Sequence, residues 1–387
     1  MSNSSGLGGG LLFLPVLFLI MDFYPHEAIP ISKVVIFAGA LSSFCVNVGV
    51  KRPGRNVVAL DYNLLIICCS NLLLGTVFGV TLNKILPNTI ILLLVCIFLS
   101  YNTYKTFKTF FKLFNEEKGI NNNNSLAEQD NHNYNINRNN DINNICEEEV
   151  RKEIEKDQYY IRWDKLMFIV IPYGIMVFLT LLRESNLVSK CSLLYWILIF
   201  IYIFVVLFFD YKAMLHIENE FNWRKRINYP FDSRDIQWNR QTVVKLAVIG
   251  FIAGFIAGTI GIGGGVVLGP ILLGLDIHPI VCTVNTNFLV LLTSSSTTFQ
   301  FILFNMLNYQ YGLLSVIFSA LGAFVATKLI NEYVKRTGEQ SLIVLILFIV
   351  VAISALVLFI SSVVEITEDY KNGMDIFEFQ PLCTTTK

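Results

Sequence analysis

The sequence has little charge and no excess of either sign. Charged residues make up 15% of the 387 residues, and 29 basic side chains balance 29 acidic ones. The net charge by itself argues neither for nor against a nucleic-acid partner. Charge is therefore informative in this chain only through its position along the sequence.

Metal and catalytic motifs are also missing. The eight cysteines mostly fall inside apolar runs without metal-ligand spacing, which indicates small buried residues. The sequence lacks an HExxH motif, a GxSxG nucleophile elbow and a pair of aspartates inside an apolar segment. We therefore expect no catalytic residues, no metal and no cofactor, and an intramembrane enzyme is disfavoured.

Hydrophobic residues are what the chain has in abundance. They make up 54% of it, 31 residues are Phe, and this composition is outside the range of an ordinary soluble domain. The sequence predicts an all-α, multi-pass membrane protein of the plasma membrane or an endomembrane. Its surroundings are then the lipid bilayer, and we expect no nucleic-acid partner.

Two glycine-rich stretches are copies of one pattern. Residues 6–15 read GLGGGLLFLP, and residues 261–270 read GIGGGVVLGP. Glycine frees the backbone from helical geometry, so each stretch should break a membrane helix and present unpaired N–H groups. The glycines could instead serve only to allow close packing of helices. However, both copies place a proline at the same distance after the glycines, and this duplication favours two halves of one binding site.

The remaining sequence divides into five parts. Residues 1–110 and 242–363 form two related membrane arms, and 163–241 contribute two connecting membrane helices and a polar loop. Residues 111–162 are a polar loop rich in Asn and charge, and 364–387 form a tail. The apolar run 10–23 is too short to cross ~30 Å of hydrocarbon and suits a re-entrant half-helix. Other helices are expected near 27–50, 61–83, 87–107, 163–183, 191–211, 243–260, 279–304, 311–333 and 340–362.

The two arms align beyond the glycines. Leu74 and Gly75, for example, correspond to Leu321 and Gly322. A full helix precedes the glycines of the second arm but only five residues precede those of the first, so the chain is either shortened or dispenses with that helix.

The positive-inside rule places the loops 51–60, 108–162 and 212–241 together on the cytoplasmic side. Re-entrant breaks bring Lys335 and Arg336 to the same side and make the arms inverted, pseudo-symmetric repeats. Counting each break as one kinked crossing gives parallel repeats instead.

The candidate substrate-binding residues lie at the breaks and on the helix after each. A short helix that starts at a break has free N–H groups and a positive dipole end, which suit an oxyanion. Polar side chains within the next helix are costly to expose to lipid and should face a cavity or a neighbouring helix. The candidates are Gly8, Gly9, Gly10, Ser32 and Lys33 in the first arm, and Gly263, Gly264, Gly265, Asn285, Thr286, Ser294 and Ser295 in the second.

Two histidines raise the question of a coupling ion. His26 and His278 flank the prolines that follow the two breaks. Imidazole titrates near neutral pH, so proton coupling through them stays open beside the favoured interpretation of interfacial, structural histidines.

The motifs together resemble the sulfite exporter family, also called TauE/SafE, and its eukaryotic members most closely. The resemblance is carried by GIGGGVV with Pro270, His278-Pro279 and the serine run at 294–296, with Asp61-Tyr62 and Ser32-Lys33 in the first arm. It implies a transporter, often an exporter, of small anions such as sulfite, sulfonates or other sulfur-containing organic acids. The alternative is a membrane sensor or scaffold that uses the same fold without transport, and the oligomeric state stays open.

Overall fold

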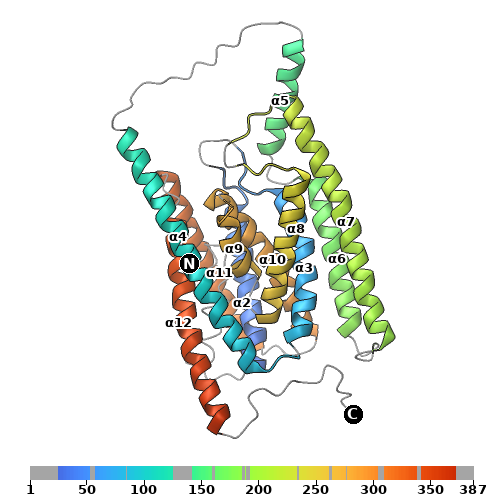
Figure 1. Ribbon diagram of the computed structural model, residues 1–387, viewed down its shortest axis with the longest axis vertical. Helices are drawn as coiled ribbons and strands as arrows, with labels where there is room; N and C mark the ends of the chain where they lie inside the picture. The colour runs from blue at the N-terminus through green and yellow to red at the C-terminus, as the bar shows by residue number, and fades with distance from the viewer. Residues whose placement is uncertain are drawn as a thin grey trace.

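The computed structural model describes residues 25–52, 57–83, 85–124, 142–158, 162–184, 188, 192–232, 235–260, 264–275, 277–303, 309–337 and 341–371 (Figure 1). In chain order its helices are α2 (Pro25–Asn47), α3 (Tyr62–Asn83), α4 (Asn88–Asn124), α5 (Ile142–Gln158), α6 (Trp163–Glu184), α7 (Leu193–Arg226), α8 (Arg240–Ile260), α9 (Gly264–Leu273), α10 (Pro279–Leu303), α11 (Tyr309–Thr337) and α12 (Ser341–Lys371). Extended pairing in this part of the chain is limited to one isolated bridge between Lys51 and Val58. The predicted all-α class is confirmed.

Seven of the described helices are long and apolar enough to cross a membrane, and they are α2, α3, α6, α7, α8, α10 and α11. α12 contributes a shorter apolar stretch, Ser341–Val357. The segment 87–107, which the sequence predicted to cross, forms the first part of α4 and is not among the seven. The chain is a multi-pass membrane protein.

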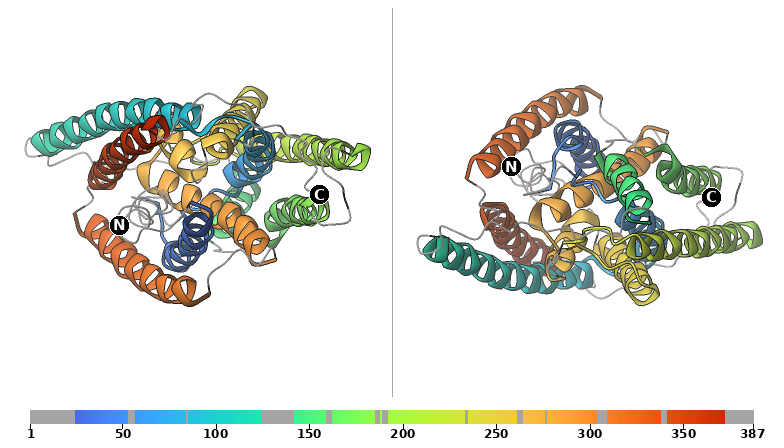
Figure 2. Two further views of the ribbon diagram at one scale, coloured as in Figure 1. Left: turned by 90° about the horizontal axis from the view of Figure 1, so that it is seen from below. Right: turned by 90° about the horizontal axis from the view of Figure 1, so that it is seen from above.

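The helices differ greatly in how deeply they are buried. The apolar window of α3 is 83% buried and that of α10 is 72% buried, whereas those of α7 and α11 are each only 22% buried. In Figures 1 and 2, α9 and α10 lie at the centre with α2 and α3, while α6 and α7 flank one side and α4, α11 and α12 the other. Large exposed side chains such as Phe204 and Phe318 cover the outer helices, as expected of a surface in contact with lipid.

The closest helix pair is α3 against α8, and glycine makes it possible. A Cβ added at Gly254 would lie 2.0 Å from the carbonyl oxygen of Leu72, and one added at Gly75 would lie 2.2 Å from that of Phe251. The backbones therefore touch without intervening side chains, as in membrane helix pairs with small residues at four-residue spacing. Gly250 and Gly254, four residues apart on α8, both face the backbone of α3.

Hydrogen bonds between helices fix their relative directions. The Ser319 hydroxyl donates to the Val35 carbonyl at 2.8 Å, and the Asn331 amide donates to Asn47 at 2.8 Å. Residue numbers rise together in this pair, so α2 and α11 run in the same direction. The glycine contacts show that α3 and α8 are also parallel to each other.

Three predicted loops meet at one end of the bundle. Arg52 pairs with Asp235, and Asp157 pairs with Arg224, so the segments 51–60, 108–162 and 212–241 share a side, as predicted. We call this the ionic end. α2 and α11 end there, whereas α3 and α8 begin there.

Helical structure extends further at the ionic end than the sequence suggested. α7 continues to Arg226, well beyond the end expected near 211, and α4 continues to Asn124. The helix α5 was not predicted, because its segment is densely charged. Ion pairs rather than apolar burial hold it in place.

Candidate functional site

The second glycine break opens the short helix α9. Gly264 and Gly265 are buried in its first turn, whereas Gly263 and the first-arm glycines Gly8, Gly9 and Gly10 lie outside the described residues. A Cβ on Gly264 would lie 3.0 Å from the side chain of Leu72, the residue that also faces Gly254. Leu72 of α3 therefore lies against both α8 and the first residue of α9.

The length of α9 shows that it does not cross a bilayer alone. Its ten residues correspond to ~15 Å, half of the ~30 Å hydrocarbon thickness. The start of α9 is buried against α3, and its Gly269 faces Thr286 of α10. A helix start, whose first N–H groups have no partner within the helix, thus lies inside the bundle, where a dipole is poorly screened.

Asn285 and Thr286, the candidates nearest the break on α10, are 0% and 1% exposed. The Asn285 amide donates to the Ala59 carbonyl at 3.2 Å, and its oxygen accepts from the backbone N–H of Asp61 at 3.0 Å. The Thr286 hydroxyl donates to the carbonyl of Cys282 in its own helix. Asn285 therefore ties α10 to the start of α3, in addition to any contact with a ligand.

The serines further along α10 form hydrogen bonds elsewhere in the bundle. Ser294 is buried and donates to the carbonyl of Val290, one turn earlier. Ser295 forms a short hydrogen bond with the hydroxyl of Tyr173 on α6. The structure does not bring these two serines to the same point as Asn285, since Ser295 faces α6 while Asn285 faces the start of α3.

In the first arm the candidates lie on α2. Lys33 is partly exposed, whereas Ser32 is 0% exposed. The Ser32 hydroxyl oxygen has no hydrogen-bond partner among the described residues, and the same is true of the side-chain oxygen of Asn287 on α10. Asn287 is also 0% exposed and its amide contacts the Ala40 carbonyl of α2 at 3.5 Å. Two buried polar atoms on the helices that follow the two breaks are thus left unpaired.

α4 adds polar groups that sequence analysis missed. Asn102 and Thr106 are each 1% exposed, and neither the Asn102 amide nor the Thr106 hydroxyl has a partner among the described residues. Lys105 lies beside them, and its ammonium lies 2.8 Å from where a Cβ on Gly274 would be, at the end of α9. The (i, i+3, i+4) spacing of these three residues places them on one face of a helix and could have predicted a polar face. Sequence analysis missed it because the segment was interpreted only as an apolar membrane crossing.

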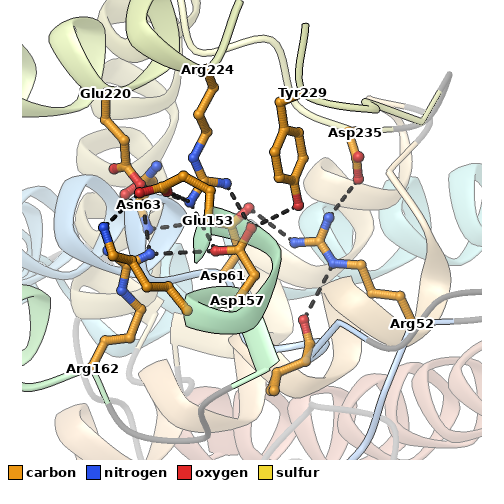
Figure 3. Close-up of polar contacts among 12 residues, drawn as sticks. Arg52, Asp61, Asn63, Glu153, Asp157, Arg162, Glu220, Arg224, Tyr229 and Asp235 are labelled. Carbon is orange, nitrogen blue, oxygen red and sulfur yellow. Dashed lines mark hydrogen bonds and ion pairs between the residues drawn. The ribbon is translucent and has the colours of Figure 1, made fainter. Parts of the chain in front are cut away.

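At the ionic end, Arg52 joins the first arm to the polar loop that precedes α8. Its guanidinium contacts the Asp235 carboxylate at 2.5 Å and the Asp61 carboxylate at 3.4 Å (Figure 3). Asp61 also accepts from the backbone N–H of Asn63 at 3.0 Å, which caps the start of α3. Asn285 of α10 binds the backbone of Asp61, whose carboxylate contacts Arg52. Arg52 in turn contacts Asp235, which precedes α8, so these contacts connect α10 to the start of α8.

Arg224 of α7 holds the helix α5. Its two terminal nitrogens each contact Asp157 at 2.8 Å, and a further contact reaches Glu153 at 3.2 Å (Figure 3). The Tyr229 hydroxyl donates to Asp157 at 2.8 Å. Bidentate pairing with a carboxylate is the strongest arrangement available to arginine. α5 is therefore fixed over the end of the membrane helices.

A cavity of about 90 Å³ lies within this cluster. Lys165 contributes contacts of 2.7 Å to Asn63 and 2.5 Å to Glu220. Burial opposes ionisation of Asp157, but its hydrogen bonds with Arg224 and Tyr229 prevail and hold the pKa of Asp157 below its ordinary value. The carboxylate is thus charged at neutral pH. The cavity is lined by basic and acidic groups together: Arg52, Arg162, Lys165, Arg224, Asp61, Asp157, Glu220 and Asp235.

A bundle of membrane helices around a short buried half-helix defines a class of multi-pass membrane protein in which small ligands bind at helix breaks. The sequence matches the family described as sulfite exporter TauE/SafE over residues 1–137 and 155–366. The chain belongs to the sulfite exporter TauE/SafE family, a family of membrane transporters.

Curated relatives from Arabidopsis thaliana agree with this assignment. Sulfite exporter TauE/SafE family protein 5 is 25% identical over 384 residues, covering 97% of this chain and 83% of the relative. Family protein 3 is 28% identical over 369 residues, covering 91% and 73%. Family protein 1 is 26% identical over 390 residues, covering 96% and 83%. No solved structure matches the chain.

Proposed function

We propose that this protein is a secondary transporter of small anions such as sulfite, sulfonates or other sulfur-containing organic acids. The substrate would bind where the two glycine breaks meet α2 and α10, and the arms would then expose it alternately on the two sides. Family membership supports the transporter class. The start of α9 and the Ser32 hydroxyl, which can both donate hydrogen bonds, support the choice of an anion.

The observation that carries this proposal is the pair of unpaired buried atoms. The hydroxyl of Ser32 and the side-chain oxygen of Asn287 belong to helices that each follow a break, and both residues are 0% exposed. Leaving a buried polar group unpaired costs about 1–3 kcal/mol. A ligand or the water that accompanies it would remove that cost. The Ser32 hydroxyl can donate to an oxyanion, as can backbone N–H groups at the start of α9, whereas the Asn287 oxygen is an acceptor and would bind the water that accompanies the anion.

The helix directions support inverted repeats rather than parallel ones. α2 runs toward the ionic end, while α10, its counterpart in the second arm, carries Asn285 at that end and runs away from it. α3 and α11 are likewise opposed. Inverted arms are a common plan of secondary transporters, since exchange of their conformations opens one side and closes the other.

Removal of the Ser32 hydroxyl tests the site without disturbing the resting fold. Because the buried hydroxyl has no partner, Ser32→Ala should raise the unliganded melting temperature but weaken sulfite binding about tenfold. Binding is measured as the rise in melting temperature with sulfite concentration in detergent. Ser43→Ala is the matched control on α2, because its hydroxyl bonds Thr327 at 2.9 Å and its loss should lower stability without changing affinity.

Equal sulfite affinity in Ser32→Ala and the unmodified protein would remove Ser32 from the site. If neither protein is stabilised by sulfite, sulfate or a sulfonate at millimolar concentration, the anion-binding proposal fails as a whole.

A further inference from the structure

A carboxylate lies inside the membrane-spanning part of α7. Asp210 is flanked by Phe209 and Tyr211 within the long apolar helix Leu193–Arg226. Its two oxygens accept one hydrogen bond from the Ser70 hydroxyl at 2.7 Å and one from the Asn71 amide at 2.8 Å, both on α3. Charged groups at such depth are costly and tend to mark functional positions.

No opposite charge compensates Asp210 from the described helices around it. α3 has no charged residue, and those of α6 and α8 lie near the helix ends. On α7 the nearest cation is Lys212, which is exposed and lies 5.7 Å from the ring of Phe208. The other titratable side chains in this region are the buried thiols of α3 and two tyrosines, Cys68, Cys69, Tyr173 and Tyr202. Two neutral donors therefore hold a carboxylate that no cationic side chain of the described helices neutralises, and a proton can do so.

α3 connects Asp210 to the glycine break. Asn71 binds the carboxylate, and the next residue, Leu72, lies against both Gly254 and Gly264. The Asn71 amide donates its second N–H to the Ile67 carbonyl one turn earlier in α3, and the Ser70 hydroxyl oxygen lies 3.0 Å from the Ile66 carbonyl oxygen, so both side chains are held against the helix. A change in how Asp210 binds α3 would thus act on the helix that supports the start of α9.

We propose that Asp210 binds a proton during the transport cycle and couples anion movement to proton symport. This inference rests on the proposed anion transport. A charged carboxylate in a low-dielectric membrane disfavours a second negative charge on the neighbouring helices, and protonation removes that repulsion. Proton and anion binding then favour each other reciprocally. The proton adds to a carboxylate oxygen on one side and leaves it on the other, with no bond to the anion and no redox step.

The two charge states of Asp210 would also bind α3 differently. The carboxylate accepts from both Ser70 and Asn71, whereas the protonated acid keeps one carbonyl acceptor and gains a donor. Protonation would therefore weaken one of the two contacts between α7 and α3. Protonation of Asp210 would thus change the contact between α7 and α3, and α3 supports the start of α9.

The test compares two transport modes in proteoliposomes containing the full chain. Radiolabelled sulfate and methanesulfonate are the probes, because their charge does not change between mildly acidic and neutral pH. In the gradient mode the outside is more acidic than the inside; in the exchange mode the pH is equal and unlabelled anion is trapped inside. The unmodified protein should show uptake about tenfold faster with the gradient than without it. Asp210→Asn should lose that response but keep exchange, because exchange needs no net proton movement.

Asp164→Asn is the matched control, since it removes a carboxylate of α6 whose side chain is 58% exposed, and it should keep both modes. Asp210→Glu restores the acid and should recover part of the gradient response. A gradient response in Asp210→Asn equal to that of the unmodified protein would overturn the assignment, as would exchange without any gradient response in the unmodified protein. Loss of both modes in Asp210→Asn with a lowered melting temperature would make Asp210 a structural contact and overturn it too. If the unmodified protein shows neither mode, anion transport itself fails and the coupling fails with it.

Discussion

Gly254 of α8 faces the carbonyl oxygen of Leu72 on α3 so closely that an added Cβ would lie 2.0 Å from it. The carbonyl oxygen of Leu72 cannot move aside to admit this Cβ, because it belongs to the backbone of α3 and not to a flexible side chain. The same Leu72 supports Gly264 at the start of α9. One residue of α3 thus sets both the spacing of the closest helix pair and the position of the half-helix.

Alanine at Gly254 should therefore separate α3 from α8. We expect Gly254→Ala to lower the free energy of unfolding in detergent by roughly 1–3 kcal/mol through overpacking. Gly174→Ala on α6 is the matched control, because nothing lies within 4 Å of the added Cβ. It should be neutral or stabilising by about 0.5–1 kcal/mol, since alanine favours a helix. Equal melting temperatures for the two variants would contradict the close packing.

Arg224→Gln should release α5 from the ionic end. The substitution removes the bidentate contact with Asp157 and the contact with Glu153, leaving Asp157 without its main partner and Glu153 paired only with Lys156. Hydrogen exchange over residues 142–158 should rise strongly while the membrane helices stay protected. Lys152→Gln breaks only an exposed pair with Glu148 and should leave exchange unchanged. Unaltered protection of α5 in Arg224→Gln would show that it does not depend on this arginine.

The attachment of α5 should depend on pH in one direction only. The pKa of Asp157 in the folded protein is lower than its ordinary value of 3.8, so its pairing contributes stability above that value and loses it as the pH falls through the lower, folded-state pKa. Protease cleavage within α5 should therefore stay constant from neutral pH down to mild acidity and accelerate only in strong acid. Release of α5 at mildly acidic pH would mean that another group controls it.

Asn285→Ala should destabilise the protein even without a ligand. It leaves the buried N–H of Asp61 and the carbonyl of Ala59 without their side-chain partner, and each unpaired buried group costs about 1–3 kcal/mol. Thr293→Val is a suitable comparison, because the Thr293 hydroxyl bonds only carbonyls of its own helix. A chemical denaturation series in detergent should give a clearly lower midpoint for Asn285→Ala. Identical midpoints would leave Asn285 with no structural role.

Apolar length and glycine spacing were enough to predict the membrane helices. The segment expected at 243–260 is α8, and its small face does admit a close neighbour. These features are local, since a run of apolar residues near bilayer length has few other solutions in lipid. The polar run on α10 was also recognisable, because such residues are rare in a membrane helix.

The charged parts of the chain were harder to predict. Asp157 and Arg224 are separated by 67 positions, and neither gives a local sign of its partner. α5 and the last turns of α7 looked like loops because charge pairs across the fold, not apolar periodicity, support them. The helix expected at 191–211 placed Asp210 in its last turn, without indicating its contacts with Ser70 and Asn71. The sequence was therefore sufficient to predict the helices that bury apolar residues. The polar and charged contacts between residues far apart in the sequence could be identified only from the structure.

Uptake of radiolabelled sulfite, sulfate and taurine into proteoliposomes tests the central claim most directly. The unmodified protein, Gly264→Val and Gly269→Ala are compared with empty vesicles after all three proteins are shown to melt as folded species. A Cβ at Gly264 meets Leu72 at 3.0 Å, whereas one at Gly269 makes an ordinary contact of 3.9 Å with Thr286. The account predicts saturable uptake of at least one anion by the unmodified protein and Gly269→Ala, and about tenfold less by Gly264→Val. Uptake by the unmodified protein no faster than by empty vesicles for all three compounds would contradict it and favour a membrane sensor or scaffold.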